Sequence, residues 1–479
     1  MLLINLIRNE FSKIFHKKSL WIVAILLVAI SITMNVMIKQ TSKNQYQNRY
    51  MYSEGYMDYL KEDLAKLDPK KPSDNAIYID TKTNLDMVEL INQFDVDSWQ
   101  REVVEKSVSS VIREKNQFEF SLEKNEEALK QKEAEYNQIC QKLEEGDWRY
   151  FAELELSNIN EQMKQLEKEQ EDMPKQQLET QKQAVTWRLE KNIPYGSTYL
   201  SRAIDMYVNY SSVAQNLAQN KDTQEYQDKL RYQQSVEKAN LYQYDIEHNT
   251  NTQEENTAHG MLMGVFGNYE VMILVILIMI AGVMISEEFN KGTIKLLLVK
   301  PYKRTSILAA KWITCIAMIF ITILFVIGVQ FIVGGLTFGW ESMDLPIVKY
   351  DFATEQITTL GMTSFLGITA LCRLPIYVLL VTLSFALSTL TNNSPLAIAL
   401  PLLGYMGSSM INALAEMYKW DWIRYFVTPN WDLTQYLFGH LPSMQGLTLA
   451  FSIAVCFVYL VIMLVPSFVV FKKKNIKNI

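Results

Sequence analysis

Residues 286–311 hold the clearest chemical pattern in this chain, and the chemistry that they suggest is docking rather than catalysis. The distinctive positions are two adjacent acids, a Gly-Thr pair and a proline, namely Glu287, Glu288, Gly292, Thr293 and Pro301. The apolar run 294–299 stops at this proline, as expected of a short amphipathic element that ends at a helix breaker. An apolar side on a loop between two membrane spans needs a surface to pack on. The alternative is a solvated connector that only orients the neighbouring spans.

The order of these residues resembles the cytoplasmic loop of type-2 ABC export permeases, the membrane subunits of ATP-driven exporters. The pattern is E-E-x3-G-T-I-x-x-L-L-x-x-P-x-x-R, followed by I-L-x-x-K at the start of the next helix. In that family the loop joins the second and third of six spans and docks on a separate ATPase. The resemblance covers residues 1–40 and 262–479. It implies an ATPase-coupling role for the five positions named above, an ATPase dimer as partner, and a second permease chain, identical or homologous.

Nucleotide chemistry is missing from the sequence itself. No GxxxxGK[ST] phosphate loop occurs, and neither a catalytic triad pattern nor a metal-ligand spacing is present. We therefore expect a chain that is not an enzyme and binds no cofactor, with ATP and Mg²⁺ held by the partner. Only Cys140 lies outside the apolar segments, so no disulfide framework is expected there; a cross-link between two copies through Cys140 stays open.

Charge divides the chain into two parts. Residues 40–260 carry 27 basic and 41 acidic residues, a net charge of −14, whereas the remainder carries 19 and 11, a net charge of +8. Such asymmetry separates an acidic soluble domain from a membrane part with basic flanks. An acidic domain is a poor partner for nucleic acid, which we exclude.

The apolar runs predict an all-α polytopic membrane protein with six transmembrane helices. Residues 1–19 form an amphipathic elbow helix at the membrane interface, with Leu3, Ile7, Phe11 and Ile14 on its apolar face. The n-region of a signal peptide is the alternative, disfavoured because the run that follows is long and lacks a cleavage site. The first span covers 20–38, and 262–479 hold five further spans around the coupling loop 286–311.

Basic residues set the orientation of the spans. They gather at the amino terminus, in the 286–311 loop and at residues 472–477, whereas the short outer loops are acidic. The positive-inside rule then predicts a cell-membrane protein with both termini cytoplasmic and residues 40–260 extracellular. We expect a short interfacial helix within 336–370 and an aromatic-rich amphipathic pair within 416–445.

The insert 40–260 predicts a helical stalk. An imperfect heptad over residues 122–143 argues against a long coiled coil, and further helices are expected near 198–220 and 223–247. Residues 69–98 contain two prolines and short apolar alternations, which favour a small strand pair or an irregular cap. The acidic character of the insert suggests cationic peptides as an extracellular ligand.

Three polar positions lie within the predicted spans. Glu270 either has a function or sits at the level of the headgroups. Gln330 is placed to hydrogen-bond across helices, and Asn35 is expected to be wet at the interface.

Together these patterns predict the permease subunit of an ABC exporter that moves an amphiphilic or peptide-like substrate, such as an antimicrobial peptide or a drug, outward. Replacement of Glu288 or Gly292 is expected to uncouple ATP hydrolysis from export. The alternative is an ATPase-linked signalling or scaffold protein that acts through its extracellular domain without transport. A membrane-bound enzyme is a weaker third reading.

Overall fold

The structure, a computed structural model, divides into two compact units that are described separately. It describes residues 2–44, 54–122, 125–166, 172–219, 225–294 and 303–474. One unit comprises residues 1–39 and 254–479, and the other comprises residues 40–253. Proline 301 of the predicted loop lies outside the described residues.

The membrane unit contains six helices or helix pairs long and apolar enough to cross a bilayer, within the described residues. Their bounds are α2 (Lys18–Asn44), α14 (Glu270–Val283) continued by α15 (Ser286–Asn290), α17 (Arg304–Phe338), α18 (Met362–Thr391), α19 (Ser394–Met417) and α20 (Leu449–Lys473). The all-α polytopic membrane fold predicted from the sequence is confirmed. Helix α17 extends beyond its apolar stretch at the amino-terminal end, where Arg304, Thr305 and Ser306 form its first turn.

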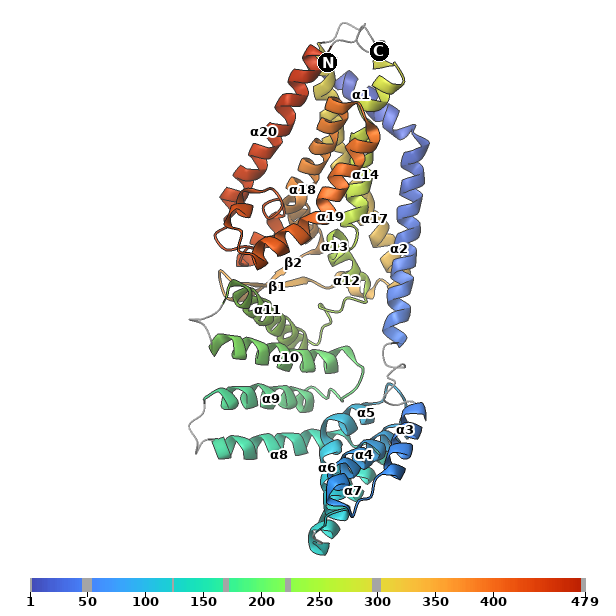
Figure 1. Ribbon diagram of the computed structural model, residues 1–479, viewed down its shortest axis with the longest axis vertical. Coiled ribbons are helices and arrows are strands. Elements are labelled where there is room, and N and C mark those ends of the chain that lie inside the picture. Colours follow the sequence, from blue (N-terminus) through green and yellow to red (C-terminus); the bar gives the residue numbers. More distant parts are fainter. Residues whose placement is uncertain are drawn as a thin grey trace. The chain divides into compact units, whose positions relative to one another are not determined.

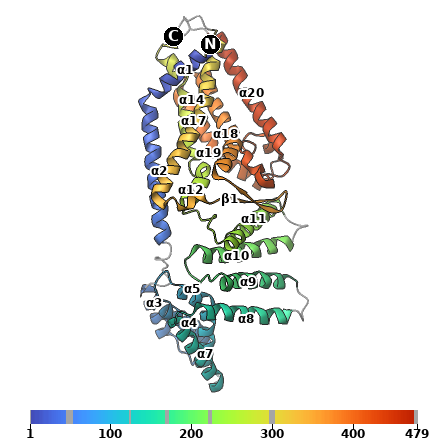
Figure 2. The same cartoon turned by 180° about the vertical axis from the view of Figure 1, so that it is seen from behind.

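Helix α14 lies at the centre of this bundle, packed against α17, α18 and α19 (Figure 1). Its sequence is apolar on every side, and Ile273, Leu277 and Ala281 are buried, as expected of a helix surrounded by other helices. Helices α2 and α20 lie at opposite edges of the bundle in both Figure 1 and Figure 2. Most of their apolar side chains are exposed, as suits helices that face lipid or another chain.

Short elements complete the membrane unit. Helix α1 (Leu2–Phe15) packs along α17, and α12 (Ala258–Met263) and α13 (Val265–Asn268) lead into α14. The loop after α17 holds η3 (Glu341–Asp344) and an antiparallel hairpin of β1 (Ile347–Asp351) and β2 (Gln356–Leu360). The stretch 336–370, where a short interfacial helix is expected, thus holds one 3₁₀ turn and this hairpin, in which Ile347 and Val348 are both buried.

The aromatic-rich segment after α19 also differs from the prediction. Its only helical pieces are the 3₁₀ turns η4 (Asp421–Tyr425) and η5 (Leu433–Gly439). Phe438 has a positive φ of 55°, which breaks helical geometry inside η5, and its carbonyl accepts a hydrogen bond from the Phe352 amide at the hairpin. The interfacial or partly re-entrant amphipathic pair expected for 416–445 thus consists of 3₁₀ turns rather than regular helices, and its place at the membrane interface stays a prediction.

The second unit is helical throughout its described residues. Its elements are α3 (Glu54–Lys66), α4 (Pro72–Ile91), α5 (Trp99–Val103), the π turn η2 (Val104–Val108), α6 (Ser109–Glu119), α7 (Glu126–Glu144), α8 (Trp148–Leu166), α9 (Asp172–Glu190), α10 (Tyr199–Gln219) and α11 (Tyr226–His248). Helices α8 to α11 pack in sequence order, each on the next (Figure 1). The strand pair expected in 69–98 is wrong: Pro72 starts α4, and Ile79, Thr83, Val88 and Ile91 are buried at helical spacing.

The end of α11 is fixed by one buried carboxylate. Asp245 is fully buried and accepts hydrogen bonds from the Thr252 hydroxyl at 2.7 Å, the Thr252 amide at 3.1 Å and the Gln253 amide at 3.0 Å. Asn249 follows in the left-handed region, a common helix ending. The polar run expected to be a linker at 249–257 is therefore ordered at its start.

Candidate functional site

Three elements of the membrane unit meet at the end of the bundle where the 286–311 segment lies. Helix α1 packs against the first turns of α17, where Leu6 contacts a small cluster with Ile307 and Ala310. Helix α15 follows α14 after a break at residues 284–285. The side of α1 that faces these elements carries Leu6, Glu10 and Ile14, spaced by four residues. One of these three inward positions is a carboxylate.

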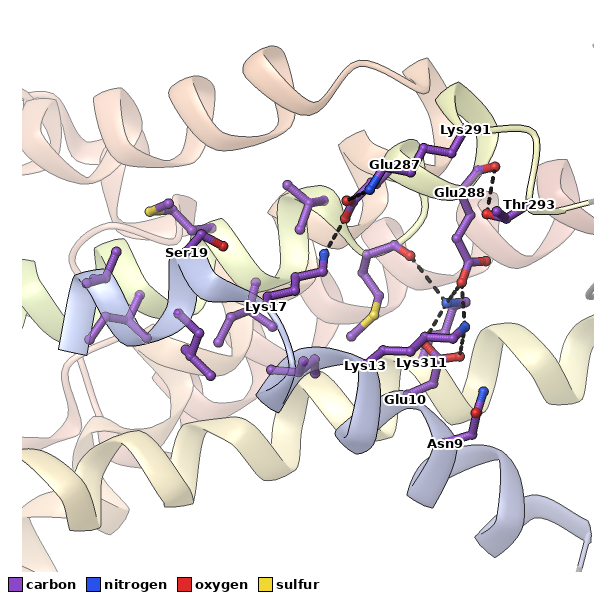
Figure 3. A pocket seen from close by; sticks show the side chains of 18 residues that line it. Asn9, Glu10, Lys13, Lys17, Ser19, Glu287, Glu288, Lys291, Thr293 and Lys311 are labelled. Atoms are coloured by element: carbon purple, nitrogen blue, oxygen red, sulfur yellow. Dashed lines mark hydrogen bonds and ion pairs between the residues drawn. The ribbon is translucent and has the colours of Figure 1, made fainter. Parts of the chain in front are cut away.

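Four charged side chains close a ring between the three elements, and we call them the buried quartet: Glu10, Lys13, Glu288 and Lys311. The Lys311 ammonium lies 2.7 Å from Glu10 Oε2 and 2.7 Å from Glu288 Oε1. Lys13 lies 2.8 Å from Glu10 Oε1 and 2.9 Å from Glu288 Oε1. Figure 3 shows these contacts converging from α1, α15 and α17.

The quartet is neutral in sum and mostly withdrawn from solvent. The side chain of Lys311 is 1% exposed and that of Glu10 is 4% exposed, whereas Lys13 remains 41% exposed. A third hydrogen bond from Lys311 reaches the Met284 carbonyl at 3.3 Å, so all three of its N–H groups have partners. Buried charges persist only when they are paired in this way, because desolvation is costly.

The electrostatics of the two α1 members follow from these contacts. Burial raises the pKa of Glu10, but the neighbouring Lys311 and Lys13 outweigh it and hold that pKa below the ordinary value of 4.5. Burial lowers the pKa of Lys13, but hydrogen bonds to Glu10 and Glu288 outweigh it and raise that pKa above 10.5. Both groups are therefore charged at neutral pH.

A second group of charges, the outer trio, borders the quartet and consists of Lys17, Glu287 and Lys291. Glu287 Oε2 accepts from Lys17, and Glu287 Oε1 lies 2.6 Å from Lys291 one helical turn away. The side chains are 35% exposed for Lys17 and 65% exposed for Lys291. Glu288 thus contacts Lys13 in the last turn of α1, and Glu287 contacts Lys17 just after that helix. Glu288 is the more buried of the two acids.

The remaining predicted loop positions lie just beyond. Gly292 has φ of +67°, the left-handed geometry that commonly ends a helix. Thr293 is exposed, and its hydroxyl lies 3.4 Å from the Glu288 carbonyl. The structure thus gives local reasons for Glu287, Glu288 and Gly292, whereas the ATPase-coupling role expected of Thr293 stays a prediction.

The apolar face predicted for the elbow is rotated. Ile14 is buried, Ile7 and Phe11 are half-buried, and Leu3 is 39% exposed, whereas Leu6 is the buried residue near the start of the helix. The interfacial position of α1 stays a prediction. Sequence reasoning missed Glu10, although one signal pointed to it: it is the only acidic residue among the first 53. A lone acid in a basic, apolar segment requires a cation nearby.

Gln330 of α17 lies in a second buried polar cluster of the same bundle, together with Asn35 and Tyr269. Its Oε1 accepts from the Tyr269 hydroxyl at 2.6 Å and from Asn35 at 3.2 Å, and its Nε2 donates to Asn35 Oδ1 at 3.1 Å. The prediction of hydrogen bonds across helices holds for Gln330, since α2 and α17 are joined here. Asn35, expected to be wet, is fully buried instead because Gln330 offers it partners inside the bundle.

Glu270 at the start of α14 is paired. Its Oε2 lies 2.6 Å from Arg373 Nη1 of α18, and Arg373 Nη2 lies 3.6 Å from Asp432 Oδ2. The side chains of Glu270 and Arg373 are only 13% and 16% exposed. The pair joins α14 to α18, and this contact gives Glu270 a structural partner that its sequence position did not reveal.

Potential metal ligands and cysteines also lie within the described ranges. No group of three or more His, Cys, Asp or Glu residues suited to a metal ion occurs among them. Cys140 is half-buried on α7, and no disulfide joins the cysteines described.

These observations define a multi-pass α-helical membrane protein with a large helical second unit. The chain belongs to the family described as "Protein of unknown function (DUF2705)", whose model matches residues 233–477. It is similar to "Uncharacterized protein YhcI" of Bacillus subtilis (strain 168), at 28% identity over 242 residues, which are 50% of this chain and 76% of the relative. It is also similar to "Uncharacterized membrane protein YdbK" of the same organism, at 26% identity over 207 residues, 43% of this chain and 79% of the relative. No solved structure matches.

Proposed function

We propose that this protein is the membrane-spanning permease subunit of an ATP-driven exporter, coupled to a separate ATPase chain through the segment that follows α15. The observation that carries the proposal is the buried quartet: just before this segment, Glu288 of α15 pairs with Lys13 of α1 and with Lys311 of α17. A force applied to the segment would therefore reach three elements together. The resemblance to the coupling loop of type-2 ABC export permeases supplies the source of that force.

The coupling mechanism follows from the rigidity of these contacts. Closure of an ATPase dimer on ATP and Mg²⁺, both held by the partner, would move the exposed residues near Thr293. Because Glu288 and Lys311 are paired and buried, α15 and α17 would follow as one body rather than bend separately. Two permease chains, identical or homologous, would then rock their spans between inward and outward states. In this arrangement the termini would lie in the cytoplasm and residues 40–260 outside, as the distribution of basic residues predicts.

The substrate class is inferred from charge. The insert is strongly acidic, so an amphiphilic or peptide-like substrate with positive charge is favoured over an anionic one. A cationic peptide bound at the second unit is consistent with the same field. The chain itself performs no hydrolysis in this proposal.

A second candidate function is ATPase-linked signalling or scaffolding without transport. It is favoured by one observation: residues 40–253 form a compact unit with their own buried cores, around Ile112 and Leu143 and around Trp187 and Ile246. A folded domain of this kind suits partner binding. Uptake of a cationic fluorescent peptide into inverted membrane vesicles on addition of ATP separates the two functions, since only a permease accumulates it.

The experiment that tests the proposed function is purification of the tagged full chain from its native membranes in mild detergent. The expected result is a co-purifying chain with a phosphate loop and ATPase activity. Thr293→Arg should lose that chain, because Thr293 is exposed and no buried contact depends on it. Lys18→Gln, another exposed position at the same end, is the control and should retain it. Recovery of the chain alone, under conditions that keep other complexes intact, contradicts the proposal.

Glu288 is a less direct probe than the sequence suggested. Its Oε1 accepts from Lys13 and Lys311, so its replacement disturbs the docking of α1 as well as the loop. A loss of ATPase binding in Glu288→Gln therefore has two causes, whereas a loss in Thr293→Arg has one.

A further inference from the structure

A cavity of about 510 Å³ opens beside the buried quartet and lies between α1, α2, α14 and α15 (Figure 3). Its size falls within the range of about 300–1,000 Å³ typical of ligand sites. One wall is apolar and runs along two membrane helices, with Leu20 and Val23 from α2 and Ile276, Ile280 and Val283 from α14. The other end carries the charged side chains described above. The cavity is thus amphiphilic, with an apolar wall inside the span and charges at its end.

The charged end has an excess of positive charge. Four lysines line it, Lys13, Lys17, Lys291 and Lys311, and three glutamates, Glu10, Glu287 and Glu288, which leaves one positive charge over. A singly charged anion complements this sum, whereas a cation does not. Basic pockets between membrane helices are known sites for anionic lipid headgroups.

Most of the unused donors in this cavity belong to the outer trio. Within the described ranges the Lys17 and Lys291 ammonium groups each have Glu287 as hydrogen-bond partner, so two of the three N–H groups on each are left over. Lys311 has none left, since its three partners are Glu10, Glu288 and the Met284 carbonyl. Figure 3 shows Lys17 and Lys291 both directed at Glu287 from separate elements. Lys13 has one N–H group left over beyond its hydrogen bonds to Glu10 and Glu288, so an anion would meet four free donors at the outer trio and one at the quartet.

One acceptor in the cavity is also unsatisfied. Glu288 Oε2 is buried and has no hydrogen-bond partner among the described residues, although Oε1 of the same carboxylate has two. A buried oxygen of this kind calls for a donor. A hydroxyl-bearing headgroup would supply one, and a headgroup with choline would not.

We propose that this cavity binds an anionic phospholipid with a hydroxylated headgroup, its phosphate against Lys17 and Lys291 and its acyl chain along the wall formed by Val23 and Ile280. The headgroup hydroxyls face Glu288 Oε2. The lipid bridges α2 to the segment after α14, so its presence stiffens the same end of the bundle as the quartet. The inference does not depend on the proposed function, because it concerns only this chain and the bilayer.

The test is a lipid titration of the delipidated full chain in detergent, followed by native mass spectrometry. Phosphatidylglycerol should bind at one site, and phosphatidylcholine with the same chains should bind far more weakly. Lys17→Gln/Lys291→Gln should weaken phosphatidylglycerol binding about thirtyfold. Each basic residue near an anionic lipid surface raises the affinity roughly fivefold to sixfold, and the double variant removes two of them. The matched control, Lys18→Gln/Lys472→Gln, removes two exposed lysines that do not line the cavity and should bind as the unaltered chain does.

A second variant tests the apolar wall without touching charge. Val23→Trp should exclude the acyl chain and abolish the site, while the Lys17 and Lys291 ammonium groups remain in place. Equal binding by the two double variants would overturn the proposal. Displacement of the lipid by glycerol phosphate at the same concentration would overturn its lipid part, since it would show a site for a free anion. Equal binding of phosphatidylcholine would overturn the requirement for an anionic headgroup.

Discussion

Replacement of Lys311 by Met should release α1 from the bundle. The substitution keeps an unbranched apolar side chain, one atom shorter, but removes the cation that lies 2.7 Å from both Glu10 and Glu288. Two buried carboxylates would then share Lys13 alone, and the neutral quartet would carry one negative charge. Truncation of one partner in a buried ion pair typically costs about 3–5 kcal/mol. Lys13 is 41% exposed, and water there screens part of the repulsion, which favours the lower end of this range.

The quantity to measure is the local opening of α1. In hydrogen exchange of the detergent-solubilised chain, a cost of about 3 kcal/mol corresponds to roughly hundredfold faster exchange of the α1 amides. Lys291→Met is the matched control: this lysine also pairs with a carboxylate, but it is 65% exposed, and such a surface pair is worth only about 0.3–0.5 kcal/mol.

A double variant separates charge from packing. Glu10→Gln/Lys311→Met restores a neutral site in which Lys13 still pairs with Glu288 at 2.9 Å. Its α1 amides should exchange more slowly than those of Lys311→Met alone, so the two changes should not add. Exchange of Lys311→Met within threefold of the unaltered chain, or a double variant as fast as the sum of both changes, would refute the reasoning.

Further predictions concern the same contacts and one pair elsewhere. Gly292→Ala should speed exchange at the end of α15 about fivefold, since a φ of +67° costs an L residue about 1 kcal/mol, whereas Gly292→Asn should cost less; equal rates would contradict this. Arg373→Met should lower the melting temperature in detergent, because Glu270 is only 13% exposed and loses its cation. Glu270→Gln/Arg373→Met should recover part of that decrease in melting temperature. An unchanged melting temperature in Arg373→Met would argue against a stabilising Glu270–Arg373 ion pair. The pKa of Glu10 is lowered in the folded state, so its contribution to α1 docking is complete above the ordinary value of 4.5 and is lost as the pH falls through the lowered folded-state pKa. Exchange of the α1 amides, corrected for intrinsic rates, should therefore become faster on acidification. Exchange that is independent of pH down to about 3 would contradict this.

The spans could be predicted from the sequence because a bilayer imposes a single requirement on length and hydropathy. Helix α14 is apolar on every side, and such a segment has few alternatives to a buried membrane helix. Helix α4 was mistaken for strand because four residues, Ala76 to Ile79, alternate locally, while the helical burial of Ile79, Thr83 and Val88 extends over a longer window. Short windows favour the wrong period.

The sequence predicts only the loop side of the candidate site. The acids of the loop stand out by their motif, but their partners lie at positions 10, 13 and 311, and no local rule joins residues about three hundred positions apart. Asn35 and Gln330 show the same limit: each is polar in an apolar helix, and only the packing of α2 on α17 makes them partners. Burial of a polar residue implies a partner but does not name it.

The most direct measurement of the central claim is site-specific photo-cross-linking in native membranes. A photoreactive amino acid replaces Thr293, which is exposed beyond the quartet, and in a second chain it replaces Tyr418, which is 62% exposed at the far end of α19. We expect the Thr293 probe to capture a chain with a phosphate loop and the Tyr418 probe to capture none. Capture of no such chain from Thr293, with the protein correctly inserted and α1 docked, would contradict the role of this segment in coupling to an ATPase.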